Sequence, residues 1–94
     1  MGMRTVTEIT IPIVNEGRIV PLRAGWICRD IAISEADVLV DGCIHLFADV
    51  VSERPFETFL FYVTVVDQPV MNEWVFVGSC VGKSGKRYFV WWGR

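Results

Sequence analysis

The sequence predicts an all-β protein, a small antiparallel barrel or sandwich of about seven strands with at most one short helical turn. Apolar residues recur almost everywhere with a period of 2, which is the period of a strand. Turn signals separate these segments at intervals of about 8–12 residues, and no segment has the 3.6-residue period of a long helix. The 94 residues fit one domain, which we expect to span residues 1–94.

Strands are expected wherever the side chains alternate along the chain. In order they are Thr5–Val14, Arg18–Arg23, Trp26–Ile33, Cys43–Val51, Phe56–Val66, Glu73–Val81 and Arg87–Trp92. Pro12 and Pro21 have no backbone N–H to donate, so the first two strands are expected at sheet edges. Phe56–Val66 is apolar on both faces, which predicts a central strand or one at an interface. Arg29 breaks the alternation of the third strand, and Gly78 predicts a bulge or a close backbone approach in the sixth.

Residues that favour turns separate the strands. They occur at Asn15–Gly17, Ala24–Gly25, Ser52–Pro55, Asp67–Asn72 and Gly82–Lys86. Ser34–Asp37 resembles a helix N-terminus, but only a few residues separate it from the turn pair Asp41–Gly42. This interval leaves room for one helical turn or a loop.

The composition indicates a compact protein with reduced thiols. With 52% apolar and 21% charged residues, the chain is too apolar for intrinsic disorder. Its longest uncharged stretches, Thr58–Val66 and Trp74–Gly82, are about half the ~20 residues of a membrane-spanning helix. The first residues lack the apolar centre of a signal peptide, so we expect a cytoplasmic location. A net charge of −2 gives no global attraction to nucleic acid or an anionic membrane. The three cysteines, an odd number without a C-x-x-C pair, favour free thiols over a disulfide scaffold.

Three patterns resemble functional sites, and each lacks a part that the chemistry needs. Gly78–Ser84 resembles a phosphate-binding loop, but three residues separate its glycines where the loop needs four, and a strand follows. Cys43 and His45 share a strand face, yet the chain lacks the close-spaced ligand pairs of zinc sites. His45, the single histidine, has Asp49 on its strand face about 13 Å away, too far to orient a catalytic imidazole. We therefore expect no catalysis, no metal and no cofactor.

The C-terminal quarter combines positive charges with aromatic rings. Cations beside stackable rings suit a protein partner, a nucleotide or single-stranded nucleic acid. The same pattern also fits ordinary core rings in a strand, with solubilising charges at the hairpin. The candidate partner- or ligand-binding residues are Lys83, Lys86, Arg87, Tyr88, Trp91 and Trp92.

Five short segments, spread over nearly the full chain, resemble those of a family of small uncharacterised proteins from tailed phages and prophages. They are Ile9–Val14, Ile19–Gly25, Leu46–Val50, Val75–Ser79 and Phe89–Trp92. The chain departs from the family at Phe47, where a tryptophan is usual, and at Val65–Pro69, which lacks the family's histidine. The resemblance implies an all-β phage accessory protein and supplies no catalytic residue.

The small size of the chain, its net negative charge and its high content of apolar residues favour a binding protein over an enzyme. We expect a phage or prophage accessory protein that inhibits or sequesters a host anti-viral factor, such as a defence protein or a signal nucleotide, in the host cytoplasm. The alternatives are a structural or virion-assembly protein, or a minor regulator that binds single-stranded nucleic acid. Neither a membrane nor nucleic acid is the expected partner. A chain this small cannot bury all its apolar residues, so we also expect a homo-oligomer, most simply a dimer, through Phe56–Val66 or Trp74–Val81.

Overall fold

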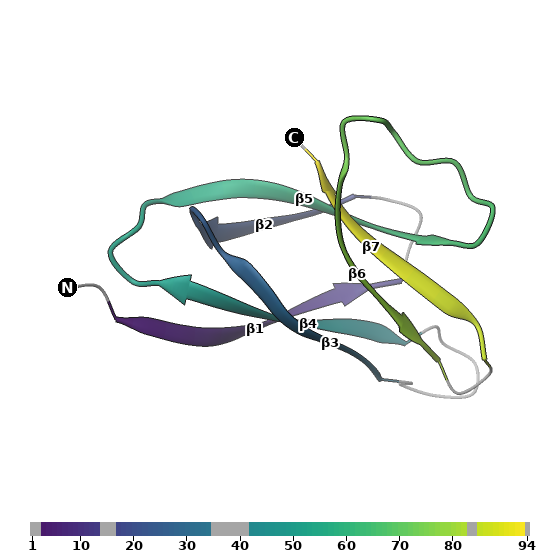
Figure 1. Ribbon diagram of the computed structural model, residues 1–94, viewed down its shortest axis with the longest axis horizontal. Coiled ribbons are helices and arrows are strands. Elements are labelled where there is room, and N and C mark those ends of the chain that lie inside the picture. Colours follow the sequence, from purple (N-terminus) through teal and green to yellow (C-terminus); the bar gives the residue numbers. More distant parts are fainter. Residues whose placement is uncertain (1–2, 14–16, 35–41, 83–84, 94) are drawn as a thin grey trace.

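The computed structural model describes residues 3–13, 17–34, 42–82 and 85–93, which form seven antiparallel β-strands in two packed sheets (Figure 1). Within these ranges there is no helix, and therefore none long and apolar enough to cross a membrane. The helical turn expected after Ser34 and the turn at Asn15–Gly17 fall wholly or partly outside the described residues.

The strands are divided between a three-stranded and a four-stranded sheet. The three-stranded sheet has the order β1-β4-β3 and contains β1 (Arg4–Pro12), β4 (Cys43–Val51) and β3 (Ile27–Ser34). The four-stranded sheet has the order β2-β5-β7-β6 and contains β2 (Arg18–Arg23), β5 (Phe56–Val65), β7 (Arg87–Gly93) and β6 (Val75–Val81). No ladder between described residues joins the two sheets, so the fold is a sandwich and the barrel alternative is wrong. Pro12 in β1 and Pro21 in β2 cannot donate to a ladder, which disfavours closure between these two edges.

Most of the strand assignments from the sequence are confirmed, with shifts at the ends. The strands that carry Pro12 and Pro21 are edge strands, and β5 is central between β2 and β7. The sixth strand begins at Val75 and not at Glu73. The ladder between β6 and β7 shifts register between Phe76 and Gly78, so the predicted bulge is present. A Cβ on Gly78 would lie 2.6 Å from Ile31 Cδ1, so glycine permits the close approach of β6 to β3.

The core lies between the sheets and consists of the inward residue of each alternating pair. It comprises Ile9, Ile11, Leu22, Ile44, Leu46, Ala48, Val50, Phe59, Phe61, Val63, Tyr88 and Val90. Phe61 is its largest fully buried side chain. Its neighbours Leu60 and Tyr62 point to the opposite, outer face of the four-stranded sheet.

A crossover segment, residues 66–74, links β5 to β6 and passes β7 on the way. Both β5 and β6 pair antiparallel with β7 and flank it, so the segment must return along the length of β7 (Figure 1). It lies against the outer face, because Trp74 stacks on Tyr62 with ring centroids 4.0 Å apart and an interplanar angle of 12°. A Cβ on Gly93 would lie 2.7 Å from Trp74 Cδ1, so the missing side chain leaves room for the indole. The chain itself thus covers part of the apolar outer side of β5.

Candidate functional site

Strand β7 places the predicted binding residues on two opposite faces. Trp91 and Arg87 point to the outer face, and Tyr88 and Trp92 point into the sandwich. Tyr88 is only 9% exposed, and the Trp92 ring meets Phe59 edge-on with centroids 5.2 Å apart. Lys83 lies outside the described residues.

The two described cations of the predicted set have different neighbours. Arg87 Nη1 donates to Ser79 Oγ at 3.1 Å on the outer face. Lys86 is exposed, with Nζ 5.8 Å from the centroid of the Tyr88 ring. Arg87 and Trp92 are separated by about 17 Å along the strand at ~3.3 Å per residue. The structure therefore brings Arg87 and Trp91 onto one face and does not gather the described members of the set into one patch.

Trp91 belongs to an apolar groove on the outer face of the four-stranded sheet. Its ring lies 5.1 Å from Phe76, and Phe89 lies 6.4 Å from Phe76, measured between ring centroids. Trp91 Nε1 donates to Thr64 Oγ1 at 2.8 Å, which ties the indole of β7 to β5. The crossover segment borders the groove, which has a volume of about 400 Å³. We call this surface the outer aromatic face; it consists of Thr64, Val66, Val70, Phe76, Phe89 and Trp91.

Several apolar side chains of the outer aromatic face are open to solvent. Phe76 is 52% exposed and Val66 is 60% exposed. Contiguous apolar surface of this kind on a small protein marks an interaction site more often than isolated exposed residues do. Sequence reasoning located β6 and β7 but could not tell which side of each strand would face out.

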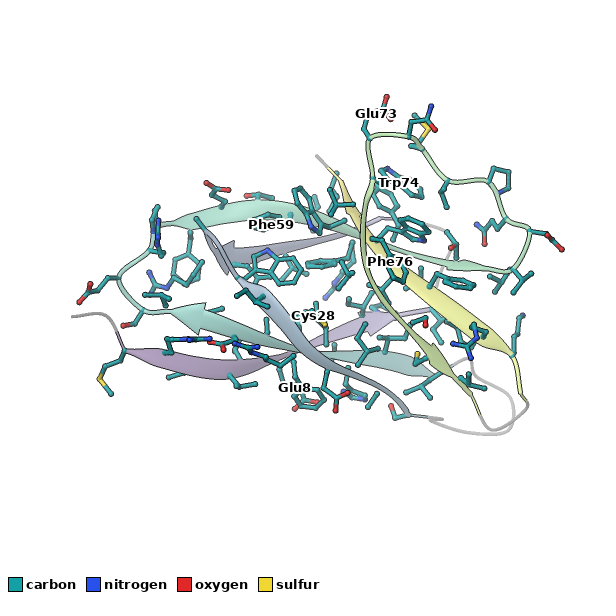
Figure 2. All side chains as sticks on the ribbon, in the orientation of Figure 1. Glu8, Cys28, Phe59, Glu73, Trp74 and Phe76 are labelled. Atoms are coloured by element: carbon teal, nitrogen blue, oxygen red, sulfur yellow. The ribbon has the colours of Figure 1, made fainter. Side chains whose placement is uncertain are left out.

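A second concavity, the inter-sheet pocket, opens where β3 and β6 diverge. It has a volume of about 530 Å³ and is lined by Gly25, Trp26, Ile27, Cys28, Glu57, Phe59, Phe76, Val77 and Trp92. Trp26 and Phe59 are nearly perpendicular, with centroids 5.8 Å apart. Figure 2 shows Cys28, Phe59 and Phe76 on three different strands, β3, β5 and β6. Burial raises the pKa of the Cys28 thiol, so this group is neutral at physiological pH.

The outer face of the three-stranded sheet carries a hydrogen-bonded chain that the sequence did not reveal. His45 Nδ1 lies 2.7 Å from Glu8 Oε1, and His45 Nε2 lies 2.7 Å from Ser34 Oγ. With the Nδ1–H tautomer, the imidazole donates to Glu8 and accepts from Ser34, in the order of a catalytic triad. Acyl transfer also needs oxyanion donors and exclusion of water, whereas Glu8 and Ser34 are exposed on a sheet face. We therefore interpret these hydrogen bonds as a structural link between β1, β4 and β3.

Asp49 forms a second polar link on the same face. It accepts a hydrogen bond from Arg4 Nε at 3.1 Å and one from Arg29 Nε at 2.9 Å. These hydrogen bonds, the one from Arg4 first, hold the pKa of Asp49 below its ordinary value. This face is therefore charged and internally paired, in contrast to the outer aromatic face.

The potential metal ligands do not converge in the described part of the chain. Cys43 and His45 lie on the outer face of β4, whereas Cys28 and Cys80 pack against the core. No group of three or more His, Cys, Asp or Glu within the described ranges is arranged to hold a metal ion.

The sequence matches no protein-family model and no curated protein, and the fold matches no solved structure. The resemblance to small tailed-phage proteins therefore stays a prediction.

Proposed function

We propose that the protein is a non-catalytic binding protein that uses its outer aromatic face to bind a host protein. The exposed apolar groove around Phe76 carries this proposal, because such a surface is stabilised when another protein covers it. Together with the resemblance to small phage proteins, this favours an accessory protein that inhibits a host defence factor in the host cytoplasm.

Two features of the outer aromatic face suit protein recognition. Its rings supply large, stiff contact area of the kind that dominates interface energetics. Arg87 lies on the same side of β7, where it can pair with an acidic residue at the rim of an interface. The alternative of single-stranded nucleic acid is less well supported, because stacking rings and cations should line one groove, whereas among the described residues Arg87 shares a face with Trp91 and Lys86 lies over the inward-facing Tyr88 ring.

The test is affinity purification from bacterial host lysate with matched surface variants. The double variant Val66→Ser/Val70→Ser removes exposed methyl groups from the groove, and Val6→Ser makes the same change on the outer face of the other sheet. A host protein should be retained in stoichiometric amount by the wild type and by Val6→Ser, and lost from the double variant. Binding to the purified host protein should have a negative ΔCp from apolar burial. Equal retention by all three proteins would contradict the proposed surface.

A further inference from the structure

The inter-sheet pocket has a chemistry unlike that of the outer aromatic face, with which it shares only Phe76 among its lining residues. We propose that it binds a small organic cation, specifically a compound that carries a methylated ammonium group. The inference rests on the aromatic lining, on the sign of the charge at the pocket and on the rigidity of its walls.

Three aromatic side chains from separate parts of the fold meet at the pocket. Trp26 precedes β3, and Phe59 and Trp92 come from β5 and β7; the ring of Phe76 lies on the outer face, against Trp91. The face of an aromatic ring carries partial negative charge, so several rings around one space attract a cation and gain further from its removal from water. A methylated ammonium group suits such a site because its methyl groups also contact the apolar walls.

The lining of the pocket disfavours an anionic ligand. Glu57 is the acidic residue of the lining, and burial raises the pKa of the Cys28 thiol, which stays neutral. None of the nine lining residues is basic, so a phosphate group would meet no neutralising charge there. The pocket therefore offers no support for a nucleotide ligand.

The arginines on either side of the Gly25–Cys28 segment are held away from the pocket. Arg23 lies over the Phe56 ring, 3.8 Å from its centroid, and Nη1 donates to the Arg54 carbonyl at 3.0 Å. Arg29 is hydrogen-bonded to Asp49 on the outer face of the three-stranded sheet. Neither guanidinium can take the position of the bound cation without breaking these contacts.

The pocket walls are fixed before a ligand arrives. Phe59 is held edge-on between Trp26 and Trp92, with interplanar angles of 85° and 89°. Interlocked rings lose little conformational freedom on binding, which favours affinity for a small ligand. The volume of about 530 Å³ is within the usual range for small-molecule sites.

The deciding experiment titrates the full-length wild-type protein with choline and with its neutral isostere 3,3-dimethylbutan-1-ol. Trp26 and Trp92 lie in the pocket, so tryptophan fluorescence should change saturably with choline. The isostere has the same shape without the charge, and it should bind at least about tenfold more weakly. Equal binding of the two compounds, or no saturable change with choline, would overturn the proposal. This comparison does not depend on the folding of any variant.

Variants then assign the binding to the pocket. Glu57→Gln should weaken choline binding severalfold without changing that of the isostere, and Trp26→Leu should abolish the saturable change while the circular dichroism stays native. Glu73→Gln removes an exposed carboxylate that does not line the pocket and should bind choline as the wild type does. An equal loss in Glu57→Gln and Glu73→Gln would place the site elsewhere. A final titration compares choline with a trimethyllysine peptide, and the unmodified peptide serves as the control. Tighter binding of the trimethyllysine peptide would indicate a cation carried by a protein, and tighter binding of choline would indicate a free small molecule.

Discussion

Substitution of Gly93 by alanine places one methyl group between β7 and the crossover segment. The new Cβ would lie 2.7 Å from Trp74 Cδ1 and 3.1 Å from Trp74 Nε1, inside van der Waals contact. The indole cannot slide along the sheet without losing its stack on Tyr62, so it must lift by most of an ångström. Overpacking of this kind costs about 1–3 kcal/mol. For a domain of this size, we expect Tm to fall by about 5–20 °C.

Urea unfolding followed by far-UV circular dichroism measures the cost without relying on Trp74 fluorescence. Gly82→Ala is the matched control, because a Cβ there meets its nearest atoms, Ile33 Cδ1 and Tyr88 Cε2, at an ordinary 3.6 Å. Gly82→Ala should change the free energy of unfolding by less than about 1 kcal/mol. In a Trp74→Ala background the clash is gone, so Gly93→Ala should then cost no more than about 0.5 kcal/mol.

Two results would refute this reasoning. If Gly93→Ala and Gly82→Ala were equally stable, the close approach of Trp74 to Gly93 would not restrict the sheet. If the effects of Gly93→Ala and Trp74→Ala were additive, the cost would arise elsewhere and the crossover segment would not be anchored by this contact.

Three further predictions follow from individual contacts and from the exposed apolar surface. Trp91→Phe removes the donor to the buried Thr64 hydroxyl and should lower the free energy of unfolding, measured in urea, by about 1–3 kcal/mol. Most of this loss should disappear in a Thr64→Val background, and equal losses in both backgrounds would contradict the prediction. The depressed pKa of Asp49 means that its stabilisation is present above the unfolded pKa, near 4, and is lost as the pH falls through the folded pKa. Asp49→Asn should therefore have a lower Tm than the wild type at pH 7, and the two Tm values should converge in acid. A Tm difference that does not change with pH would contradict this. The outer aromatic face leaves Phe76 52% exposed and Val66 60% exposed, and a second copy of the chain would bury this apolar surface. In the absence of a host protein we expect a dimer through the outer aromatic face, and a constant monomer mass in sedimentation equilibrium at low micromolar concentration would exclude it.

The candidate site was only partly predictable, and β7 shows why. Alternation along Arg87–Trp92 correctly predicted a strand with two sets of side chains. It could not indicate whether Trp91 or Trp92 would face the second sheet, because both sets are aromatic. The answer depends on pairing with β5, whose buried Phe61 lies opposite Trp92 and therefore turns Trp92 inward.

His45 shows the same limit for polar contacts. Its own strand offers Asp49 as an acidic partner, and distance along the strand excludes that residue. Glu8 and Ser34 reach the imidazole from β1 and β3, at sequence separations of 37 and 11 residues. No spacing rule within one strand predicts such pairs, because the sheet order β1-β4-β3 brings them together.

The sequence by itself determined the local properties of this protein. Period-2 alternation set the strands, Pro12 and Pro21 set two edges, Gly78 set a bulge, and the doubly apolar Phe56–Val66 set a central strand. Each of these follows from backbone geometry within a few residues. Tertiary structure alone decided that the strands form a sandwich, that residues 66–74 cross over β7, and that Trp26, Phe59 and Trp92 enclose one pocket. These features depend on contacts between segments far apart in the chain, and the free energy of such contacts comes from packing whole faces together.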